Sequence, residues 1–293
     1  MINNKLFYCS NKDTYPPFKN GLYLEEFFCK YMIDNNIQTK RKYIPALWTN
    51  FQIEGWFKNK KNEMQSALNQ WISQNPSKNG YFTIVQYDDG PLLSLPENTI
   101  VYGACSGNIP LPLIYQDNNN ILINLPKKSF NEKNILCSFV GNITSNSIQP
   151  DVRKLIFNKF VRNTLFKLIN SGGWTPSVNG NLQKIFIETT IMSKFTLAPR
   201  GYGRSSFRFF ECFLLGSIPI YIWNDINWLP FQKIIDYNKL CIVIHISQID
   251  ELENIINNID ENNYMNMWSY YNEIKHLFEL EGMTKQIILE ENK

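Results

Sequence analysis

The amino-acid sequence predicts an α/β protein of two units, each a mostly parallel sheet covered by helices. Strand-like and helical segments alternate along the chain, which is the pattern expected when helices connect parallel strands. Polar stretches rich in Asn and Lys interrupt this pattern at residues 116–120 and 126–134, after which it begins again. We therefore expect a first domain over residues 1–130 and a second domain over residues 131–262.

The first domain is predicted from three strand-like segments and one amphipathic helix. The helix is expected over residues 22–33, where apolar residues recur at helical spacing. A strand over residues 81–87 is rich in β-branched and aromatic residues and ends at Asp88-Asp89-Gly90-Pro91. The other two strands are expected over residues 5–10 and 99–102.

The second domain repeats the alternation of strands and helices. Its longest predicted helix begins at Pro150-Asp151, which suits a first helical turn, and continues to residue 168 with apolar residues three to four apart. The helix over 206–215 is followed by Gly216, which suits the position just after a helix end. We expect strands at 135–140, 195–198, 218–223 and 240–246, and further helices at 182–193, 251–259 and 264–280.

Composition and charge argue against several classes of protein. The net charge of the 293 residues is only +3 and the lysines are scattered, so we expect no nucleic-acid partner. The six cysteines match no C-x-x-C or zinc spacing, so we expect reduced thiols and no bound metal. There is no signal-like apolar stretch at the start and no run of about 20 apolar residues. We therefore expect a cytoplasmic protein without a membrane anchor.

The segment 195–216 is the most informative part of the chain. A buried strand is expected to enter a turn that contains Gly201 and Gly203, and then a helix. The amino end of a helix offers unpaired N–H groups and partial positive charge, so it attracts anions. Glycines allow the backbone to approach a phosphate closely. Ser205 or Ser206 can cap the helix or donate a hydrogen bond to a phosphate oxygen.

Three arginines strengthen the prediction of an anion site. Arg204 and Arg208 are four residues apart and share one helix face, and Arg200 stands at the end of the strand. Guanidinium groups match phosphate geometry, so we expect the three arginines to converge on a diphosphate. Glu211 could accept hydrogen bonds from ribose hydroxyls, and Tyr202 could stack on a base or sugar. An ordinary capped helix with an Arg208–Glu211 surface ion pair is the alternative.

Two common nucleotide-binding motifs are excluded. Gly201-x-Gly203 lacks the third glycine of a dinucleotide fingerprint, because Ser206 stands at that position. The chain also contains no G-x-x-x-x-G-K-S/T phosphate loop.

An ordered series of motifs in the second half of the chain resembles the core signature of exostosin-type glycosyltransferases. This resemblance covers most of residues 135–260. The matching motifs are Phe139-Val140-Gly141 followed by Arg153, Pro199-Arg200-Gly201, Ser206-x-Arg208-x-x-Glu211, Gly216-x-Ile218-Pro219, Leu229-Pro230-Phe231 and Ile235-Asp236-Tyr237. In the first half, residues 86–90 and 109–114 look like the smaller, unanchored bacterial and viral members of the family.

The resemblance implies a GT-B architecture, in which two Rossmann-like domains face a central cleft. The second domain would bind a nucleotide-sugar donor, expected to be UDP-linked, and the first a saccharide or glycan acceptor. The segment 263–293 would form a C-terminal helix that packs back on the first domain. Transfer would invert the anomeric centre without a metal or other cofactor, and the chain has no Asp-x-Asp motif. Arg204 matches no family position.

An inverting transfer also needs a base for the acceptor hydroxyl. Both histidines, His245 and His276, lie in the second half of the chain, so the first domain has no histidine base. Asp88 and Asp89 follow a predicted strand directly and are our candidates, although Asp-Asp-Gly-Pro is also good turn chemistry.

Alternatives to these choices remain open. Asp13 is a second candidate base, and Glu25 and Glu26 are others, although a solvated helix face is the ordinary interpretation of the two glutamates. A non-catalytic nucleotide- or glycan-binding protein of the same fold is the alternative function. A nucleic-acid binder would need a steep salt dependence of its affinity.

Overall fold

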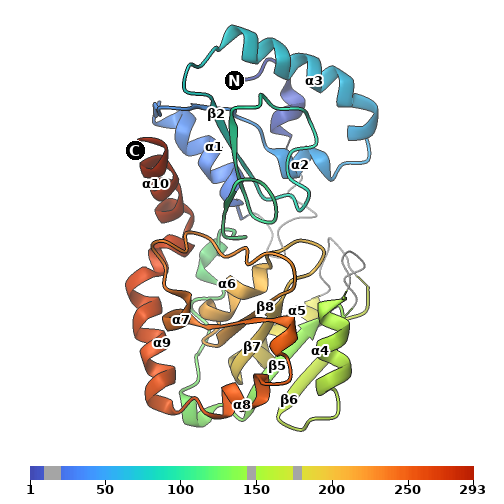
Figure 1. The fold of residues 1–293 in the computed structure, drawn as a ribbon, viewed down its shortest axis with the longest axis vertical. Helices are drawn as coiled ribbons and strands as arrows, with labels where there is room; N and C mark the ends of the chain where they lie inside the picture. Colours follow the sequence, from blue (N-terminus) through green and yellow to red (C-terminus); the bar gives the residue numbers. More distant parts are fainter. Residues whose placement is uncertain (10–20, 144–149, 174–179) are drawn as a thin grey trace. The chain divides into compact units, whose positions relative to one another are not determined.

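The computed structural model describes residues 1–9, 21–143, 150–173 and 180–293. Its contacts divide the chain into two compact units (Figure 1). The first unit comprises Met1–Gln116 and His276–Lys293, and the second comprises Asp117–Lys275. Residues 117–130, which the sequence placed with the first domain, therefore belong to the second unit in this division.

The first unit is built on a parallel sheet whose central strands are buried. Within the described residues the strand order is β1-β2-β3-β4, and every pairing is parallel. All five residues of β2 are buried. The strands are β1 (Lys42–Tyr43), β2 (Tyr81–Val85), β3 (Thr99–Gly103) and β4 (Ile109–Pro110), and the helices are α1 (Leu24–Asp34), α2 (Trp48–Gln52), α3 (Phe57–Gln74) and α10 (Leu280–Glu291).

Aromatic side chains form much of the core of this unit. Trp48 is fully buried and donates from Nε1 to Thr83 Oγ1 at 2.7 Å, so its only polar atom is satisfied. Phe7 packs edge-on against Trp48 and Phe51, with ring centroids 6.4 and 5.4 Å away. The predicted strand at 5–10 is wrong over Lys5–Tyr8, which form a 3₁₀ helix. The Asn4 side chain caps that helix by accepting from Leu6 N.

A buried carboxyl group lies at the carboxyl end of β2. Glu25 is 1% exposed and accepts hydrogen bonds from Thr49 N, Thr49 Oγ1 and Gln86 N at 2.8, 2.7 and 2.9 Å. Burial raises the pKa of Glu25 from 4.5 to about 8, although these hydrogen bonds oppose the shift. The interpretation of Glu25 as part of a solvated helix face is wrong, because α1 turns this residue towards the sheet.

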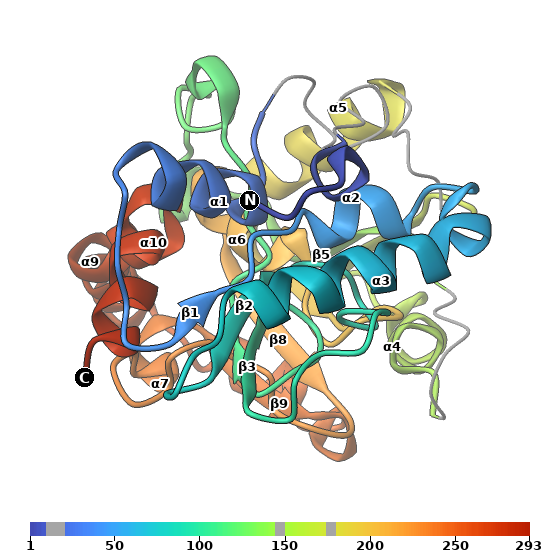
Figure 2. The ribbon, with the colours of Figure 1, turned by 90° about the horizontal axis from the view of Figure 1, so that it is seen from above.

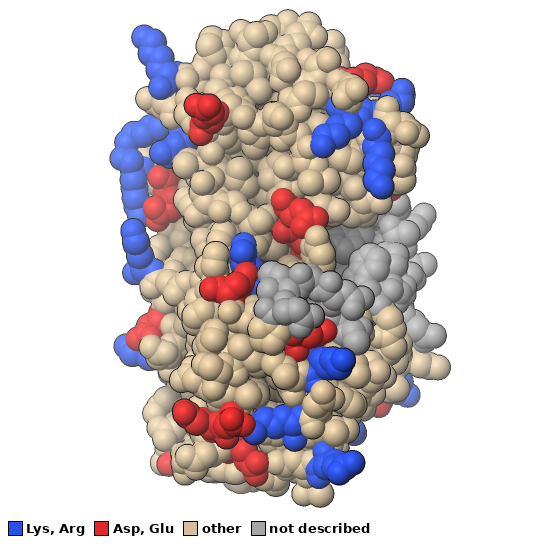
Figure 3. Space-filling view, turned by 45° about the vertical axis from the view of Figure 1, so that its right-hand side comes forward, with Lys and Arg blue, Asp and Glu red and all other residues tan. Residues whose placement is uncertain are grey.

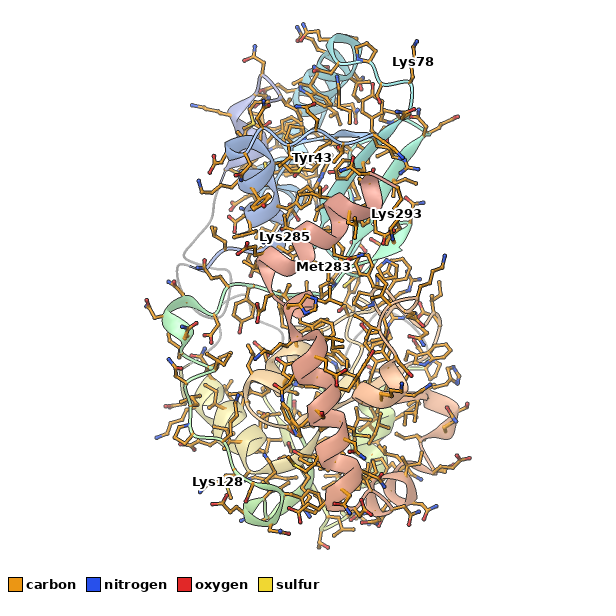
Figure 4. The ribbon with its side chains drawn as sticks, turned by 90° about the vertical axis from the view of Figure 1, so that its left-hand side faces the viewer. Tyr43, Lys78, Lys128, Met283, Lys285 and Lys293 are labelled. Atoms are coloured by element: carbon orange, nitrogen blue, oxygen red, sulfur yellow. The ribbon has the colours of Figure 1, made fainter. Side chains whose placement is uncertain are left out.

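The C-terminal segment returns to the first unit. Helices α1 and α10 lie side by side (Figures 1 and 2). Met283 of α10 is fully buried, whereas Lys285 pairs at the surface with Glu281 (Figure 4). Near the end of the helix, Tyr102 OH donates to Glu291 Oε1 at 2.6 Å. The expected C-terminal helix of residues 263–293 is therefore divided, because α9 (Glu261–Ile274) belongs to the second unit.

The second unit contains a parallel sheet with strand order β6-β5-β7-β8-β9. The chain passes from β5 to β6 on one side and then to β7 on the other side of β5. Ligands bind at such reversals in parallel sheets, in the crevice beyond the carboxyl ends of the strands. The strands are β5 (Ile135–Gly141), β6 (Phe166–Asn170), β7 (Ser193–Pro199), β8 (Ile218–Trp223) and β9 (Ile242–His245).

Helices cover this sheet, but one predicted helix is shorter than expected and α7 (Tyr237–Leu240) was not predicted. The helix expected over 150–168 ends at Phe160, and its last residues belong to β6. Asn163 turns the chain, since its side chain accepts from Leu165 N at 2.9 Å, and Phe166 then stacks on Phe160 at 4.1 Å. Besides α9, the described helices are α4 (Val152–Phe160), α5 (Gly180–Ile191), α6 (Phe207–Leu214), α7 (Tyr237–Leu240) and α8 (Leu252–Asn257).

The predicted α/β class is confirmed, and the described strands form two parallel sheets, one in each unit. None of the six cysteines forms a disulfide bond. None of the helices in the described ranges is long and apolar enough to span a membrane. On the face shown in Figure 3, basic and acidic side chains are interspersed.

The buried carboxyl group predicts a pH-dependent stability. Because the pKa of Glu25 is raised to about 8, the folded chain keeps a proton between pH 4.5 and 8 that the unfolded chain has lost. The free energy of unfolding should therefore fall as pH rises through this window, by at most about 1.4 kcal/mol per pH unit. Glu25→Gln should remove this component, as measured by urea unfolding between pH 5 and 8. The exposed Glu63→Gln is the control, and equal slopes for wild type and Glu25→Gln would contradict the assignment.

Candidate functional site

The predicted anion-binding residues lie between the end of β7 and the first turn of α6. Ser206 is the N-cap of α6 with extended backbone angles, φ −149° and ψ 136°, but its side chain makes no capping hydrogen bond. Ser205 and Ser206 are both partly exposed, and Gly203 is buried. At the other end of the helix, Gly216 has φ +81°, which confirms its predicted place just after the helix.

Arg208 lies in the first turn of α6 and reaches the carboxyl end of β5. Its Nη2 donates to Val140 O at 2.6 Å, and its guanidinium lies 4.6 Å from the centre of the Phe139 ring. Burial lowers the pKa of Arg208, and its Nε is buried without a hydrogen-bond partner. Within the residues that the structure describes, Arg208 forms no ion pair. A partly buried cation without a counter-charge is costly, so an anionic ligand would stabilise it.

The alternative Arg208–Glu211 surface ion pair is not present in the described structure. Glu211 is only 9% exposed, and its influence on Arg208 is a weaker electrostatic one than the effect of burial. The Arg208 side chain instead extends away from its own helix towards Val140 and Phe139.

Two glycines make room for two guanidinium groups. A Cβ atom on Gly141 would lie 2.5 Å from Arg208 Nη2, and one on Gly201 would lie 2.7 Å from Arg153 Nη2. Arg153 donates from Nε to Arg200 O and from Nη1 to Asn142 O, both at 3.1 Å. Gly141 and Gly201 stand at the ends of neighbouring strands, so both arginines lie at the reversal point of the sheet.

Arg200 and Arg204 meet at a carboxylate that the sequence did not single out. Arg200 Nη1 lies 2.5 Å from Asp225 Oδ1, and Arg204 Nε lies 2.9 Å from Asp225 Oδ2. Partial burial alone would raise the pKa of Asp225, but hydrogen bonds from Arg200, Ile226 N and Arg204 lower it to about 2. The three predicted arginines therefore do not converge on one point, because two of them share Asp225 and Arg208 lies against β5.

Hydrogen bonds join the loops that follow four neighbouring strands. Arg200 Nη1 donates to Asn224 Oδ1 at 3.1 Å, and Asn224 Nδ2 donates to Pro150 O at 3.2 Å. His245 Nε2 lies 3.2 Å from Asn224 O, while its ring packs edge-on against Trp223. Asn224 and Asp225 directly follow β8. The rule that selected Asp88 and Asp89, polar residues just after a strand, would also have selected them.

Tyr202 has the most exposed aromatic ring of this segment. It is 53% exposed, and its carbonyl oxygen accepts from Arg200 Nη2 at 3.0 Å. The backbone of the turn is therefore held while the ring faces solvent, as stacking on a ligand would require.

The candidate bases lie in a braced turn of the first unit. Gly90 N donates to Tyr87 O at 3.0 Å and closes the turn that contains Asp88 and Asp89. Gln52 holds this turn from α2, since its Nε2 donates to Gly90 O at 2.9 Å. Asp88 is partly exposed and Asp89 is exposed.

The other candidate bases have different positions. Glu25 is enclosed by its hydrogen bonds, and Glu26 caps α1 by accepting from Tyr23 N. Neither carboxylate is therefore placed as a solvated group. Asp13 lies outside the described residues.

A cavity of about 320 Å³ opens beside the connection between β8 and α7. Its lining includes Asn227, Lys233 and Asp236, and none of the predicted donor-binding residues. It is therefore distinct from the site at the start of α6.

Comparison with known proteins gives a family match. The model of the Exostosin GT47 domain matches residues 94–259, a range that contains all the predicted donor-binding residues but not Asp88 or Asp89. Two probable glycosyltransferases of Arabidopsis thaliana are similar to the chain. One is 26% identical over 94 residues, 32% of this chain and 18% of the relative, and the other is 27% identical over 90 residues, 31% and 19% respectively. The chain thus matches less than a fifth of the length of these relatives.

Among solved structures, the crystal structure of TarM superposes with a TM-score of 0.40 and 13% sequence identity. The superposition covers 90% of this chain and 58% of TarM.

The contact between Gly141 and Arg208 can be tested by one added methyl group. The Cβ of Gly141→Ala would displace the end of the Arg208 side chain, which can move at little cost to folding. We expect a nearly unchanged melting temperature but affinity for UDP reduced about tenfold, the scale of one hydrogen bond to a charged group. Gly173→Ala is the matched control, since its Cβ would meet no atom of the described residues within 4 Å. Calorimetry that found wild-type affinity in Gly141→Ala would contradict the role of this contact.

Proposed function

Because the chain belongs to the exostosin GT47 family of glycosyltransferases, we propose that it transfers a sugar from a UDP-linked donor to a saccharide or glycan hydroxyl. The proposed transfer inverts the anomeric centre and needs no metal ion. The family match supports the class of reaction, while the donor, the stereochemistry and the metal independence are our inferences.

The single observation that supports the donor site best is the environment of Arg208. This guanidinium lies at the carboxyl end of β5, beside the amino end of α6, and it has no ion-pair partner in the described part of the chain. A diphosphate would supply the missing negative charge and an acceptor for the buried Nε. The peptide dipoles of α6 would add to this attraction.

In the proposed reaction, the negative charge that develops on the leaving group needs the most stabilisation. The acceptor oxygen attacks the anomeric carbon, the bond from that carbon to the β-phosphate oxygen breaks, and UDP leaves with an additional negative charge. Arg208 and the start of α6 would stabilise that charge as it develops, which is the task of a metal ion in other transferases. Arg153 and Arg204 would add positive charge nearby. The Tyr202 ring would stack on the base or sugar, and Glu211 remains our candidate contact to ribose.

The acceptor proton must pass to a base, for which we propose Asp88 or Asp89. These carboxylates lie three and four residues after the end of β2 and are partly exposed or exposed, unlike Glu25. A carboxylate that receives the proton as the acceptor oxygen attacks would complete the inverting transfer.

A non-catalytic nucleotide- or glycan-binding protein is the second candidate function. Two observations favour it: hydrogen bonds of Gly90 and Gln52 hold the Asp88–Asp89 turn as an ordinary structural turn, and the turn lies outside the Exostosin GT47 match. Such a protein would bind a nucleoside diphosphate but would not release it from a sugar donor.

The proposed reaction can be tested with a panel of nucleotide sugars. We expect release of a nucleoside diphosphate from a UDP-linked donor, at the same rate with and without EDTA. Loss of activity in EDTA would contradict metal independence. If no donor turns over but UDP raises the melting temperature, the binding protein is the better assignment.

Arg208→Ala should weaken UDP binding by about 1.5–3 kcal/mol, because it removes a charge-assisted contact in a partly buried site. Arg208→Lys should recover only part of this loss, since an ammonium group lacks the guanidinium fork. Arg162→Ala is a control at an exposed arginine of the same unit. Unchanged calorimetric affinity in Arg208→Ala would remove Arg208 from the donor site.

Asp88→Asn and Asp89→Asn test the base separately. The substitution at the true base should lower kcat about 10²–10⁴-fold, the usual contribution of general-base catalysis, while UDP affinity stays unchanged. The other substitution serves as its control. Turnover within a few-fold of wild type in both variants would show that neither carboxylate is the base.

A further inference from the structure

We propose that Asp225 is a positioning residue of the donor site, which holds the loop of residues 200–206 through its ion pairs with Arg200 and Arg204. This inference rests on the proposed function, because the loop matters only if it receives a donor. Asp225 follows β8 and therefore joins a second loop to the one that leads into α6.

The two arginines provide several of the loop's attachments. Arg200 donates from Nε to Gly201 O at 3.4 Å and from Nη2 to Tyr202 O at 3.0 Å. Arg204 lies with its guanidinium 5.3 Å from the Trp228 ring, and its carbonyl oxygen accepts from Tyr221 OH at 3.3 Å. Arg200 thus holds two carbonyl oxygens of its own loop, while Arg204 attaches the loop to Trp228 and Tyr221.

The two arginines that pair with Asp225 differ in burial, so each depends on Asp225 in a different way. The Arg200 side chain is 4% exposed, whereas the Arg204 side chain is 26% exposed and that of Asp225 is 22% exposed. Arg200 would be an uncompensated buried cation without Asp225, and removing one partner of such a pair is strongly destabilising locally. Arg204 is at the rim, where its pair with Asp225 limits the directions that its side chain can take.

The ion pairs that Asp225 forms with Arg200 and Arg204 persist at ordinary pH. The pKa of Asp225 is about 2, since the hydrogen bonds from Arg200, Ile226 N and Arg204 outweigh the effect of burial. Asp225 therefore stays ionised, and the loop is fixed before any ligand arrives. A loop ordered in advance binds more tightly because less conformational entropy is lost on binding.

An opposite role for Asp225 is physically reasonable and gives the opposite result. As a carboxylate beside two arginines, Asp225 could occupy the place of a phosphate and repel the donor. Its removal would then free Arg204 and strengthen UDP binding. The burial of Arg200 argues against this role, because Arg200 cannot turn towards a ligand without leaving Asp225 and its own loop carbonyls.

Calorimetric titration of the full chain with UDP distinguishes these roles. We expect Asp225→Asn to raise the Kd for UDP about tenfold or more. Asp225→Glu keeps the negative charge but moves it by one methylene. This variant should fold and lose less affinity for UDP than Asp225→Asn. Asp250→Asn is the matched control, since Asp250 pairs with Lys159 at an exposed site of the same unit and should bind UDP as wild type does.

A double-mutant cycle tests whether Asp225 acts through the loop. The double variant, Asp225→Asn with Arg204→Ala, should raise the Kd for UDP less than the product of the two separate increases. The shortfall should be about threefold or more. If the two substitutions change the Kd independently, Asp225 does not act through Arg204. That result would overturn the proposed positioning role.

The outcomes separate this inference from the function on which it rests. If the wild type binds UDP and Asp225→Asn and Asp225→Glu bind it equally well or more tightly, the positioning role is wrong and the donor site stands. If the wild type binds neither UDP nor pyrophosphate, the donor site is wrong and the role of Asp225 falls with it.

Discussion

The gathering of positive charge at the carboxyl edge of a parallel sheet is the constraint on which the second unit depends. Arg153, Arg200 and Arg208 reach this edge from different elements and donate to backbone carbonyl oxygens. Carbonyl oxygens satisfy individual N–H groups but do not neutralise the charge. Only Asp225 supplies a full counter-charge in the described part of this edge, and it serves Arg200 and Arg204. The remaining imbalance at Arg208 is what would give the unit the affinity for an anion that the proposed donor site requires.

The first unit has an ionisable group of the opposite charge, an acid, at the carboxyl end of its sheet. Glu25 is an acid buried at the carboxyl end of β2, and its acceptors are satisfied by the neutral donors of Thr49 and Gln86. There is no cation among these partners, so burial keeps its pKa high. The two sheets therefore have different chemistry at equivalent edges: one gathers cations, while the other encloses a carboxyl group and exposes two more in the turn after β2.

Local pattern predicted much of this molecule, and long-range contacts account for what it missed. Sequence could predict the strand at 218–223 and the turn and helix that follow β7. Hydrophobic periodicity, glycine positions and helix-capping residues are all local signals. Residues 166–168 were assigned to a helix because Leu165 and Leu168 suit either period, and only pairing with β5 makes them a strand. Helix α3 was not predicted, although its buried Phe57, Met64, Leu68 and Trp71 recur at the spacing of one helix face. The ion pairs of Asp225 join distant segments, which no spacing rule reveals.

The return of α10 to the first unit has a consequence for how the chain folds as it is made. Residues 276–293 emerge from the ribosome only after the whole of the second unit, yet Met283 and Glu291 are buried in the first. Until then Tyr102 and Arg41 lack their partner Glu291, and α1 lacks the helix beside it. The second unit, which is continuous in sequence, can complete its core earlier. The N-terminal half of the protein is therefore the last to be finished, and during synthesis its exposed apolar surface is the part most dependent on protection from aggregation.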